Sequence, residues 1–200
     1  MTPEEIVKAI SGIPSWLYET TQPGKGFKDV TVLSEYASRL NPGDTYLEIG
    51  TAYGASAVVV ALSSDPGVRI VTIDNCHPDN HPDVGIAVYK AKVQLNLNKS
   101  DLWKGRIEFI FGDANEIEWE GDIHALFIDG AHGYADVKKD FFRWSPFIPV
   151  GGYILFHDYE GLPAGKNGVN DVIMFAMLPQ GVWEPEVALF GIYVARRLAF

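Results

Sequence analysis

The sequence predicts a doubly wound α/β fold, with a sheet of seven strands whose last strand is antiparallel. Short apolar runs rich in Ile, Val, Phe and Tyr alternate with longer stretches whose apolar residues recur at helical spacing. This alternation requires crossover connections, so most strands pair in parallel and helices cover both faces. The segment 182–197 departs from the alternation, because two apolar runs follow each other through a tight connection. We therefore expect the last strand to run antiparallel.

Apolar runs between turn-forming residues predict the strands in chain order. They are TYLEIG (45–50), RIVTID (69–74), RIEFIFG (106–112), ALFID (125–129), YILFHD (153–158) and ALFGIYVAR (188–196), with VWEPEV (182–187) as the hairpin partner of the last run. Continuous apolar strands are typical of a parallel sheet that is buried on both faces.

Helical spacing predicts crossover helices between these strands. They are 55–64, 87–99 and 135–147. Before the first strand we expect a further helix from about Thr31 to Leu40, with Asp29 or Thr31 as its N-cap. The whole chain is expected to form a single domain, in which 1–42 provide N-terminal lid or edge helices and 43–200 provide the catalytic core.

Composition and charge limit the class of protein. The 200 residues are 47% hydrophobic and 21% charged, which is sufficient for one domain with a buried core. A formal net charge of -10 repels nucleic-acid phosphates and anionic lipids, so we expect neither nucleic acid nor membrane as a partner. The N-terminus does not resemble a signal peptide, no apolar run is long enough to span a membrane, and the single cysteine permits no internal disulfide. We expect a cytoplasmic protein.

The first predicted strand leads into LEIGTAYGAS (47–56), which has the features of a ligand-binding turn. Gly50 and Gly54 let the backbone turn sharply, and the following helix offers its N-terminal amides to a negatively charged group. The alternative is an ordinary strand-to-helix turn. A dinucleotide fingerprint needs GxGxxG, but position 52 is Ala. A carboxylate at Glu48 would repel a pyrophosphate and attract a sulfonium, which favours S-adenosylmethionine as the ligand.

Two aspartates follow the next strands at positions where a nucleoside could be held. Asp74 ends the second strand, 24 residues after Gly50, where an acid commonly takes up two ribose hydroxyls. The alternative is a capping or solvent-facing aspartate. Asp113 follows the third strand and could accept a hydrogen bond from an adenine amino group, although the residue alone is equally typical of a helix N-cap.

The stretch NCHPDNHP (75–82) contains Cys76, His77 and His81, which are all potential zinc ligands. Structural zinc normally recruits two ligand pairs from separate segments, and the sequence has no second cysteine. We therefore interpret the stretch as a loop beside the ribose.

Five strand ends taken together resemble one enzyme family. LEIGTAYGAS, Asp74, GDA (112–114), FIDGAHGYADVKKD (127–140) and GGYILFHDY (151–159) are similar to class I S-adenosylmethionine-dependent methyltransferases, in the branch with IDG-x-H-x-Y and HDY motifs. The resemblance implies a Rossmann-like fold. The cofactor-binding residues that it implies are Glu48, Gly50, Thr51, Gly54, Ser56, Asp74, Asp113, Ala114 and Asp129.

The fourth and fifth strands end in ionisable groups that would meet at one rim of the sheet. Asp129 ends ALFID, His132 follows three residues later, and His157 with Asp158 ends YILFHD. By the resemblance to metal-dependent small-molecule O-methyltransferases, Asp129, His157 and Asp158 bind Mg²⁺ or Mn²⁺, and His132 is the general base. Those enzymes usually have an acid where His157 stands, and imidazole suits transition metals better than Mg²⁺. The alternative is a hydrogen-bonding network without a metal.

These observations lead to one expected function and two alternatives. We expect methylation of a hydroxyl on a small molecule, such as a sugar or a secondary metabolite, with Trp16, Tyr18 and Tyr159 at the mouth of the site and further contacts from the loop 159–171. A dinucleotide-dependent oxidoreductase is disfavoured by the missing middle glycine and by the C-terminal hairpin. A non-catalytic cofactor-binding module is the other alternative. The acceptor and the oligomeric state stay open, and a homodimer is compatible with the sequence.

Overall fold

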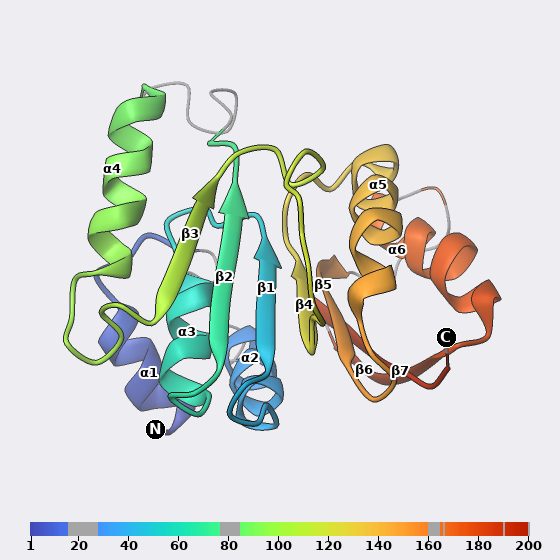
Figure 1. The fold of residues 1–200 in the computed structure, drawn as a ribbon, viewed down its shortest axis with the longest axis horizontal. Helices are drawn as coiled ribbons and strands as arrows, with labels where there is room; N and C mark the ends of the chain where they lie inside the picture. Colours follow the sequence, from blue (N-terminus) through green and yellow to red (C-terminus); the bar gives the residue numbers. More distant parts are fainter. Residues whose placement is uncertain (16–27, 77–84, 160–164, 166, 190, 200) are drawn as a thin grey trace.

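The computed structural model describes residues 1–15, 28–76, 85–159, 165, 167–189 and 191–199. Its strands form a seven-stranded sheet in the order β3-β2-β1-β4-β5-β7-β6 (Figure 1). They are β1 (Thr45–Ile49), β2 (Arg69–Asp74), β3 (Ile107–Phe111), β4 (Ala125–Ile128), β5 (Tyr153–Tyr159), β6 (Trp183–Leu189) and β7 (Gly191–Arg197). The pairs are parallel except that β7 runs antiparallel to both β5 and β6. The predicted fold class is confirmed.

The predicted crossover helices correspond to α3, α4 and α5. The helices are α1 (Pro3–Ile10), α2 (Lys28–Ser38), α3 (Ala55–Ser63), α4 (Ile86–Leu97), α5 (Tyr134–Trp144) and α6 (Gly168–Val172), with 3-10 turns at Ser145–Phe147 and Leu178–Gln180 and a π turn at Ile173–Met177. Within the described part of the chain, no helix has the length and apolar character that a bilayer span requires.

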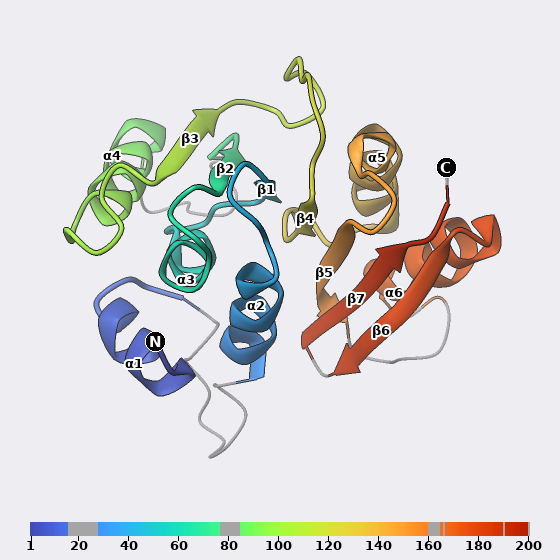
Figure 2. The same cartoon turned by 60° about the horizontal axis from the view of Figure 1, so that its bottom comes forward.

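The helices form two layers, one on each face of the sheet (Figures 1 and 2). Buried side chains of α1, α2, α3 and α4 pack together against one face, and those of α5 and α6 pack against the other. Strand residues alternate between these two clusters: Tyr46 belongs to the first and Leu47 to the second. Every residue of β1 is buried, as expected for a central strand of a parallel sheet.

The N-terminal helices are part of the first layer. Helix α1 begins with a capping box, in which Thr2 and Glu5 exchange side-chain and backbone hydrogen bonds, and its apolar side buries Ile6 and Ile10. The prediction for α2 was wrong at its start: the helix includes Asp29 in its first turn and Thr31 thereafter, so neither is the N-cap. The carboxylate of Asp29 instead lies at the sheet, 3.7 Å from the imidazole of His157.

Helix α6 was not predicted from the sequence, which was interpreted there as a loop. Its five residues are too few to show helical periodicity. The helix is started by Asn167, whose side chain accepts hydrogen bonds from the amides of Val169 and Asn170.

Glu48, the fourth of the five residues of β1, is completely buried. Its carboxyl group accepts hydrogen bonds from the hydroxyls of Tyr46 at 3.1 Å and Thr72 at 2.8 Å. Burial raises the pKa of Glu48 to about 8, and hydrogen bonds from Ser56, Thr72 and Tyr46 only partly offset this effect. In the cofactor-free protein, burial therefore favours the protonated form of Glu48.

Replacing Glu48 with Gln should make stability less dependent on pH. The pKa of about 8 in the folded protein exceeds the ordinary value of 4.5, so the folded state holds a proton that the unfolded chain has released. The wild-type protein should therefore lose stability as the pH rises from about 5 to about 8, and Glu48→Gln should lose less. Thermal unfolding across this pH range measures the slope, with the exposed Glu118→Gln as control. Equal slopes in Glu48→Gln and wild type would contradict the effect of burial.

Candidate active site

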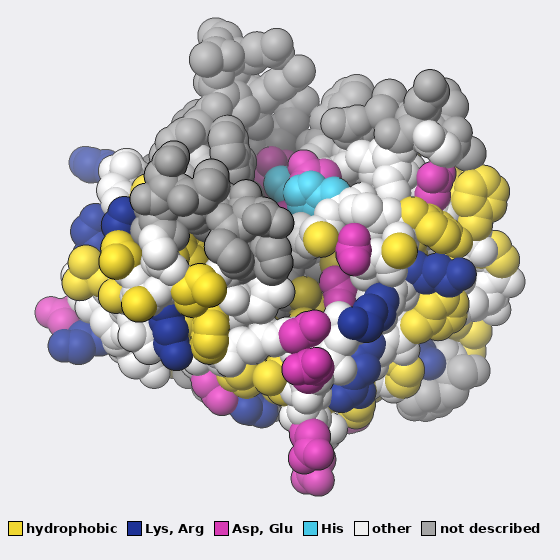
Figure 3. Space-filling model, turned by 90° about the horizontal axis from the view of Figure 1, so that it is seen from above, with side chains coloured by type: hydrophobic (Ala, Val, Ile, Leu, Met, Phe, Trp, Pro, Cys, Tyr) yellow, Lys and Arg dark blue, Asp and Glu magenta, His cyan; other side chains and the backbone are white. Residues whose placement is uncertain are grey.

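A cavity of about 1030 Å³ opens at the carboxyl ends of the parallel strands, where open α/β sheets bind their ligands. The predicted site residues that line it are Gly50, Thr51, Ser56, Asp74, Asp113, Ala114, Asp129, His132, His157 and Asp158. Two of the predicted cofactor-binding residues are not among its lining: Glu48 is buried inside the sheet, and Gly54 is the N-cap of α3. Seen from above, histidine and acidic side chains lie next to one another on this face (Figure 3).

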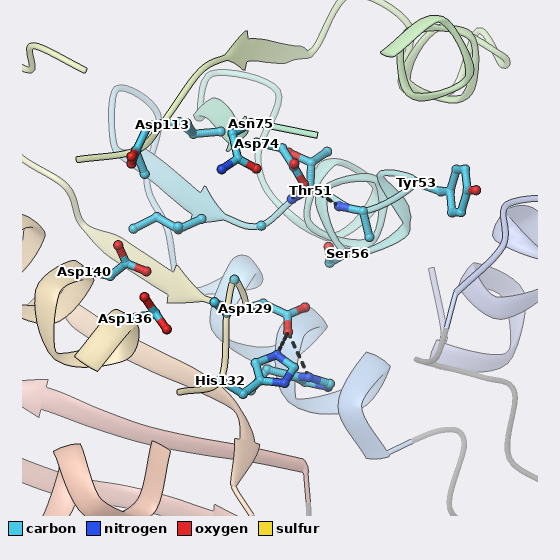
Figure 4. A pocket seen from close by; sticks show the side chains of 18 of the residues that line it. Thr51, Tyr53, Ser56, Asp74, Asn75, Asp113, Asp129, His132, Asp136 and Asp140 are labelled. Atoms are coloured by element: carbon cyan, nitrogen blue, oxygen red, sulfur yellow. Dashed lines mark hydrogen bonds and ion pairs between the residues drawn. The ribbon is translucent and has the colours of Figure 1, made fainter. Parts of the chain in front are cut away.

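The loop after β1 and the end of β2 form one side of the cavity (Figure 4). Gly50 has φ +91°, and a Cβ there would overlap the backbone carbonyl of Asp129, so only glycine fits. One oxygen of Asp74 accepts hydrogen bonds from the amides of Thr51 at 2.9 Å and Ala52 at 3.1 Å. The other accepts the amide of Cys76 at 2.5 Å. Asp74 therefore holds the loops after β1 and β2 together while it faces the cavity.

Asp113 lies at the far end of the same side and closes a turn. Its Oδ1 accepts the backbone amide of Asn115 at 2.8 Å, and this hydrogen bond holds the pKa of Asp113 below its ordinary value. The described residues 112–122 contain no helix, so the alternative of a helix N-cap is not observed. Ala114, beside it, is 8% exposed and also lines the cavity.

One wall of the cavity comes from α5 and was not predicted as part of the site. Asp136, Lys139 and Asp140 line it. Figure 4 shows Asp136 and Asp140 on this side of the cavity. Burial raises the pKa of Asp140 to about 6, although Asn115 donates a hydrogen bond to its Oδ1 at 3.0 Å. The spacing of these residues, three and four positions apart, was the available signal, since such residues share one side of a helix.

Four ionisable side chains gather on the opposite side of the cavity, at the ends of β4 and β5. His132 Nε2 lies 2.9 Å from Asp158 Oδ2 and 3.9 Å from Asp129 Oδ1. His157 Nδ1 lies 3.0 Å from Asp129 Oδ1 and 3.3 Å from Asp158 Oδ2. The structure therefore brings together the four residues that the sequence placed at two separate strand ends.

Asp29 of α2 adds a third carboxylate, which the sequence did not place at the site. Its Oδ2 lies 3.7 Å from His157 Nε2, so the imidazole is surrounded by Asp29, Asp129 and Asp158. Burial opposes a charge on His157, but the three carboxylates outweigh it and raise its pKa to about 12. Without a competing cation, His157 is an imidazolium at neutral pH.

Asp158 and His132 shift each other's pKa in opposite directions: that of Asp158 is lowered and that of His132 is raised. Burial disfavours the charge of Asp158, but the hydrogen bond from His132 and the charge of the neighbouring His157 outweigh this effect and hold the pKa of Asp158 well below its ordinary value. The hydrogen bond to Asp158 raises the pKa of His132, against the effect of burial. His132 is the more accessible partner, since about half of its side chain is exposed.

The same residues offer two overlapping sets of ligand atoms for a divalent cation. Ligand atoms of Asp129, His132 and Asp158 lie within 4.8 Å of one another. The predicted set has His157 instead, whose Nδ1 lies 3.0 Å and 3.3 Å from the two carboxylates, close to the spacing of about 3 Å between adjacent ligands in six-coordinate Mg²⁺. Both His157 nitrogens are buried without a well-directed hydrogen bond to any described residue. Buried nitrogens of this kind fit a metal ligand.

The mouth of the cavity only partly matches the prediction. Pro14 and Ser15 line it, so the N-terminal segment reaches the site. Tyr159 does not line it, because its ring packs 5.2 Å from that of Tyr193. The other predicted residues, Trp16 and Tyr18 at the mouth and His77 and His81 in the ribose loop, lie outside the described residues.

Residues 47–159, more than half of the chain, match a family model described as a methyltransferase domain. Protein y4gI of Sinorhizobium fredii is 27% identical over 118 residues, which make up 57% of this chain and 13% of that protein. The chain therefore spans only a small part of the length of this relative.

Solved structures of O-methyltransferases have the same fold. The O-methyltransferase NovP superimposes with a TM-score of 0.65 over 88% of this chain and 81% of that one, at 15% identity. TomG from Streptomyces achromogenes, solved in complex with S-adenosylmethionine, superimposes with a TM-score of 0.62 over 98% and 89%, at 16% identity. The chain belongs to the methyltransferase domain family, and the class I methyltransferase predicted from its strand-end motifs is confirmed.

Proposed function

We propose that this enzyme transfers a methyl group from S-adenosylmethionine to a hydroxyl oxygen of a small molecule. The observation that carries the proposal is the cavity itself, in which the Gly50 loop and Asp74 face His132 and Asp158. The sulfonium of the donor already activates the methyl group. The protein therefore has to align the two reactants and remove one proton.

The donor would occupy the side of the cavity formed by β1, β2 and β3. The loop at Gly50 and Thr51 offers backbone to the methionine half, Asp74 accepts the ribose hydroxyls, and Asp113 with Ala114 holds the adenine. Oδ2 of Asp74 already accepts two amides and Oδ1 accepts one, so the ribose would be accepted through the remaining lone pair of Oδ1. Glu48 would act indirectly, through its hydrogen bond with Ser56.

The acceptor would occupy the side that carries His132. Nε2 of His132 pairs with Asp158 at 2.9 Å, so in the neutral ring Nε2 carries the hydrogen and Nδ1 keeps the free lone pair. The acceptor hydroxyl would give its proton to Nδ1 as its oxygen attacks the methyl carbon and the carbon–sulfur bond breaks. Asp158 would stabilise the imidazolium that results, as a carboxylate does beside a catalytic histidine.

The negative charge on the His132 side of the cavity limits which acceptors can bind there. Asp29, Asp129 and Asp158 outnumber the single imidazolium of His157. A neutral or positively charged acceptor is therefore favoured over a phosphate or a carboxylate. A sugar or a neutral secondary metabolite meets this condition.

A divalent cation at Asp129, His157 and Asp158 is the second element of the proposal. The spacing of the ligand atoms and the buried nitrogens of His157 support it. A bound cation would orient the acceptor hydroxyl and lower its pKa. The competing set contains His132 in place of His157, and in that set His132 would not be free to act as the base.

Asp74→Ala should weaken S-adenosylmethionine binding by roughly 1.5–3 kcal/mol, because the ribose hydroxyls lose a charged acceptor. Calorimetry measures the affinity. Binding of methylthioadenosine, which retains the ribose but lacks the amino acid part, should be weakened by a similar amount. Thermal unfolding shows whether the variant is folded. Wild-type affinity in folded Asp74→Ala would remove the donor assignment.

His132→Ala and His132→Gln should each slow turnover by about 10²–10⁴-fold, the usual loss for a general base. Donor affinity should be unchanged, since the adenosine contacts lie across the cavity. The acidic limb of the wild-type rate profile should also disappear. Turnover near the wild-type rate in both variants would show that another group takes the proton.

EDTA should abolish turnover, and Mn²⁺ should restore it at least as well as Mg²⁺ because of the imidazole ligand. Binding of Mn²⁺, followed by electron paramagnetic resonance, separates the two ligand sets. His157→Ala should weaken binding strongly, while His132→Gln should leave it near the wild-type level. Full turnover in EDTA would contradict the cation site.

A further inference from the structure

The N-terminus of α6 contacts the backbone on both sides of the pair formed by His132 and Asp158. We propose that Asn167 and Gly168 are positioning residues that set the separation of these two side chains. The kinetic consequence rests on the proposed function, whereas the separation itself can be measured in the free protein.

Asp158 has a backbone conformation that needs support from outside its own strand. Its φ is +56°, in the left-handed region that non-glycine residues rarely adopt. The register between β5 and β7 shifts here: His157 pairs with Ile192 and Tyr159 with Gly191, which leaves Asp158 in a β-bulge. Bulges redirect side chains, and this one directs the Asp158 carboxylate to His132.

The side-chain amide of Asn167 supplies such support. Its Nδ2 donates to the backbone carbonyl of Asp158 at 3.0 Å. Its Oδ1 accepts the amides of Val169 at 2.8 Å and Asn170 at 3.2 Å and so caps α6. Since the oxygen must face the helix, the nitrogen must face Asp158. Only a side chain that is both donor and acceptor meets both demands.

Gly168 makes the second contact, with the loop that carries the base. A Cβ at Gly168 would overlap the carbonyl oxygen of His132 and the amide nitrogen of Tyr134. The first residue of α6 therefore packs directly against the backbone of the loop between β4 and α5. Its φ is not left-handed, so the need for glycine arises from this contact and not from its own conformation.

Through these two contacts, the short helix α6 links the two loops that carry the pair. His132 and Asp158 lie on different loops, and α6 touches the backbone of both. A change at either contact should move one member of the pair relative to the other, while the donor side of the cavity stays in place. Misplacement of about 1 Å at a reacting group can cost about 10²-fold in rate.

The first test is Asn167→Asp, which keeps the size and the helix cap but removes the donor to Asp158. In a crystal structure of the variant, the separation of His132 Nε2 and Asp158 Oδ2 should increase from 2.9 Å to beyond about 3.5 Å. The turnover number should fall about 10²-fold with unchanged donor affinity. Asn167→Ala, which loses the cap as well, should show the same displacement with a lower Tm.

The second test is Gly168→Ala, compared with Gly85→Ala. Gly85 also lies at a helix N-terminus, as the N-cap of α4, but a Cβ there meets nothing within 4 Å among the described residues. Gly168→Ala should displace His132 and slow turnover, while Gly85→Ala should retain both the geometry and the rate.

An unchanged separation of His132 and Asp158 in folded Asn167→Asp and Gly168→Ala would overturn the proposal. The same holds if the separation changes but turnover does not. If the wild-type protein methylates no acceptor, the proposed function fails, and the crystallographic comparison still decides whether Asn167 and Gly168 hold the pair.

Discussion

The close approach of β1 and β4 at Gly50 and Asp129 is the constraint on which the site depends. The space that a Cβ would need at Gly50 is occupied by the backbone carbonyl of Asp129. The backbone amide of Asp129 donates a hydrogen bond to the carbonyl oxygen of Ile49 at 2.8 Å. The loop that faces the donor and the strand end that faces the acceptor are therefore in direct backbone contact. Because a parallel sheet brings all its carboxyl ends to one edge, this contact fixes the distance between the two halves of the cavity.

Electrostatic attraction also holds the residues of the acceptor side together. His157 lies among carboxylates from α2, β4 and β5, so one buried imidazole connects the N-terminal helices to the rim. A cation that displaced its proton would keep these carboxylates together by the same attraction. Either state keeps Asp158 ionised beside His132, which the proposed base requires.

The parts of the site that the sequence predicted are those that follow from strand order. Asp74, Asp113 and Asp129 stand at or just after the end of a strand, Asp158 stands one residue before the end of β5, and parallel pairing of these strands brings all four to one edge. Asp29 could not be placed in this way, because its position depends on how α2 packs on the sheet. The raised pKa of Glu48 could not be predicted for a similar reason, since a sequence does not show that a strand residue is completely buried. Helix α6 was missed because its start depends on hydrogen bonds made by Asn167 and not on apolar periodicity.

A crystal structure with S-adenosylhomocysteine bound tests the central claim most directly. The account predicts that the ribose hydroxyls lie on Asp74, that the adenine lies beside Asp113 and Ala114, and that the sulfur faces the side of the cavity that carries His132 and Asp158. A ligand bound in the opposite direction, with its adenine against His132, or a ligand outside this cavity, would contradict it.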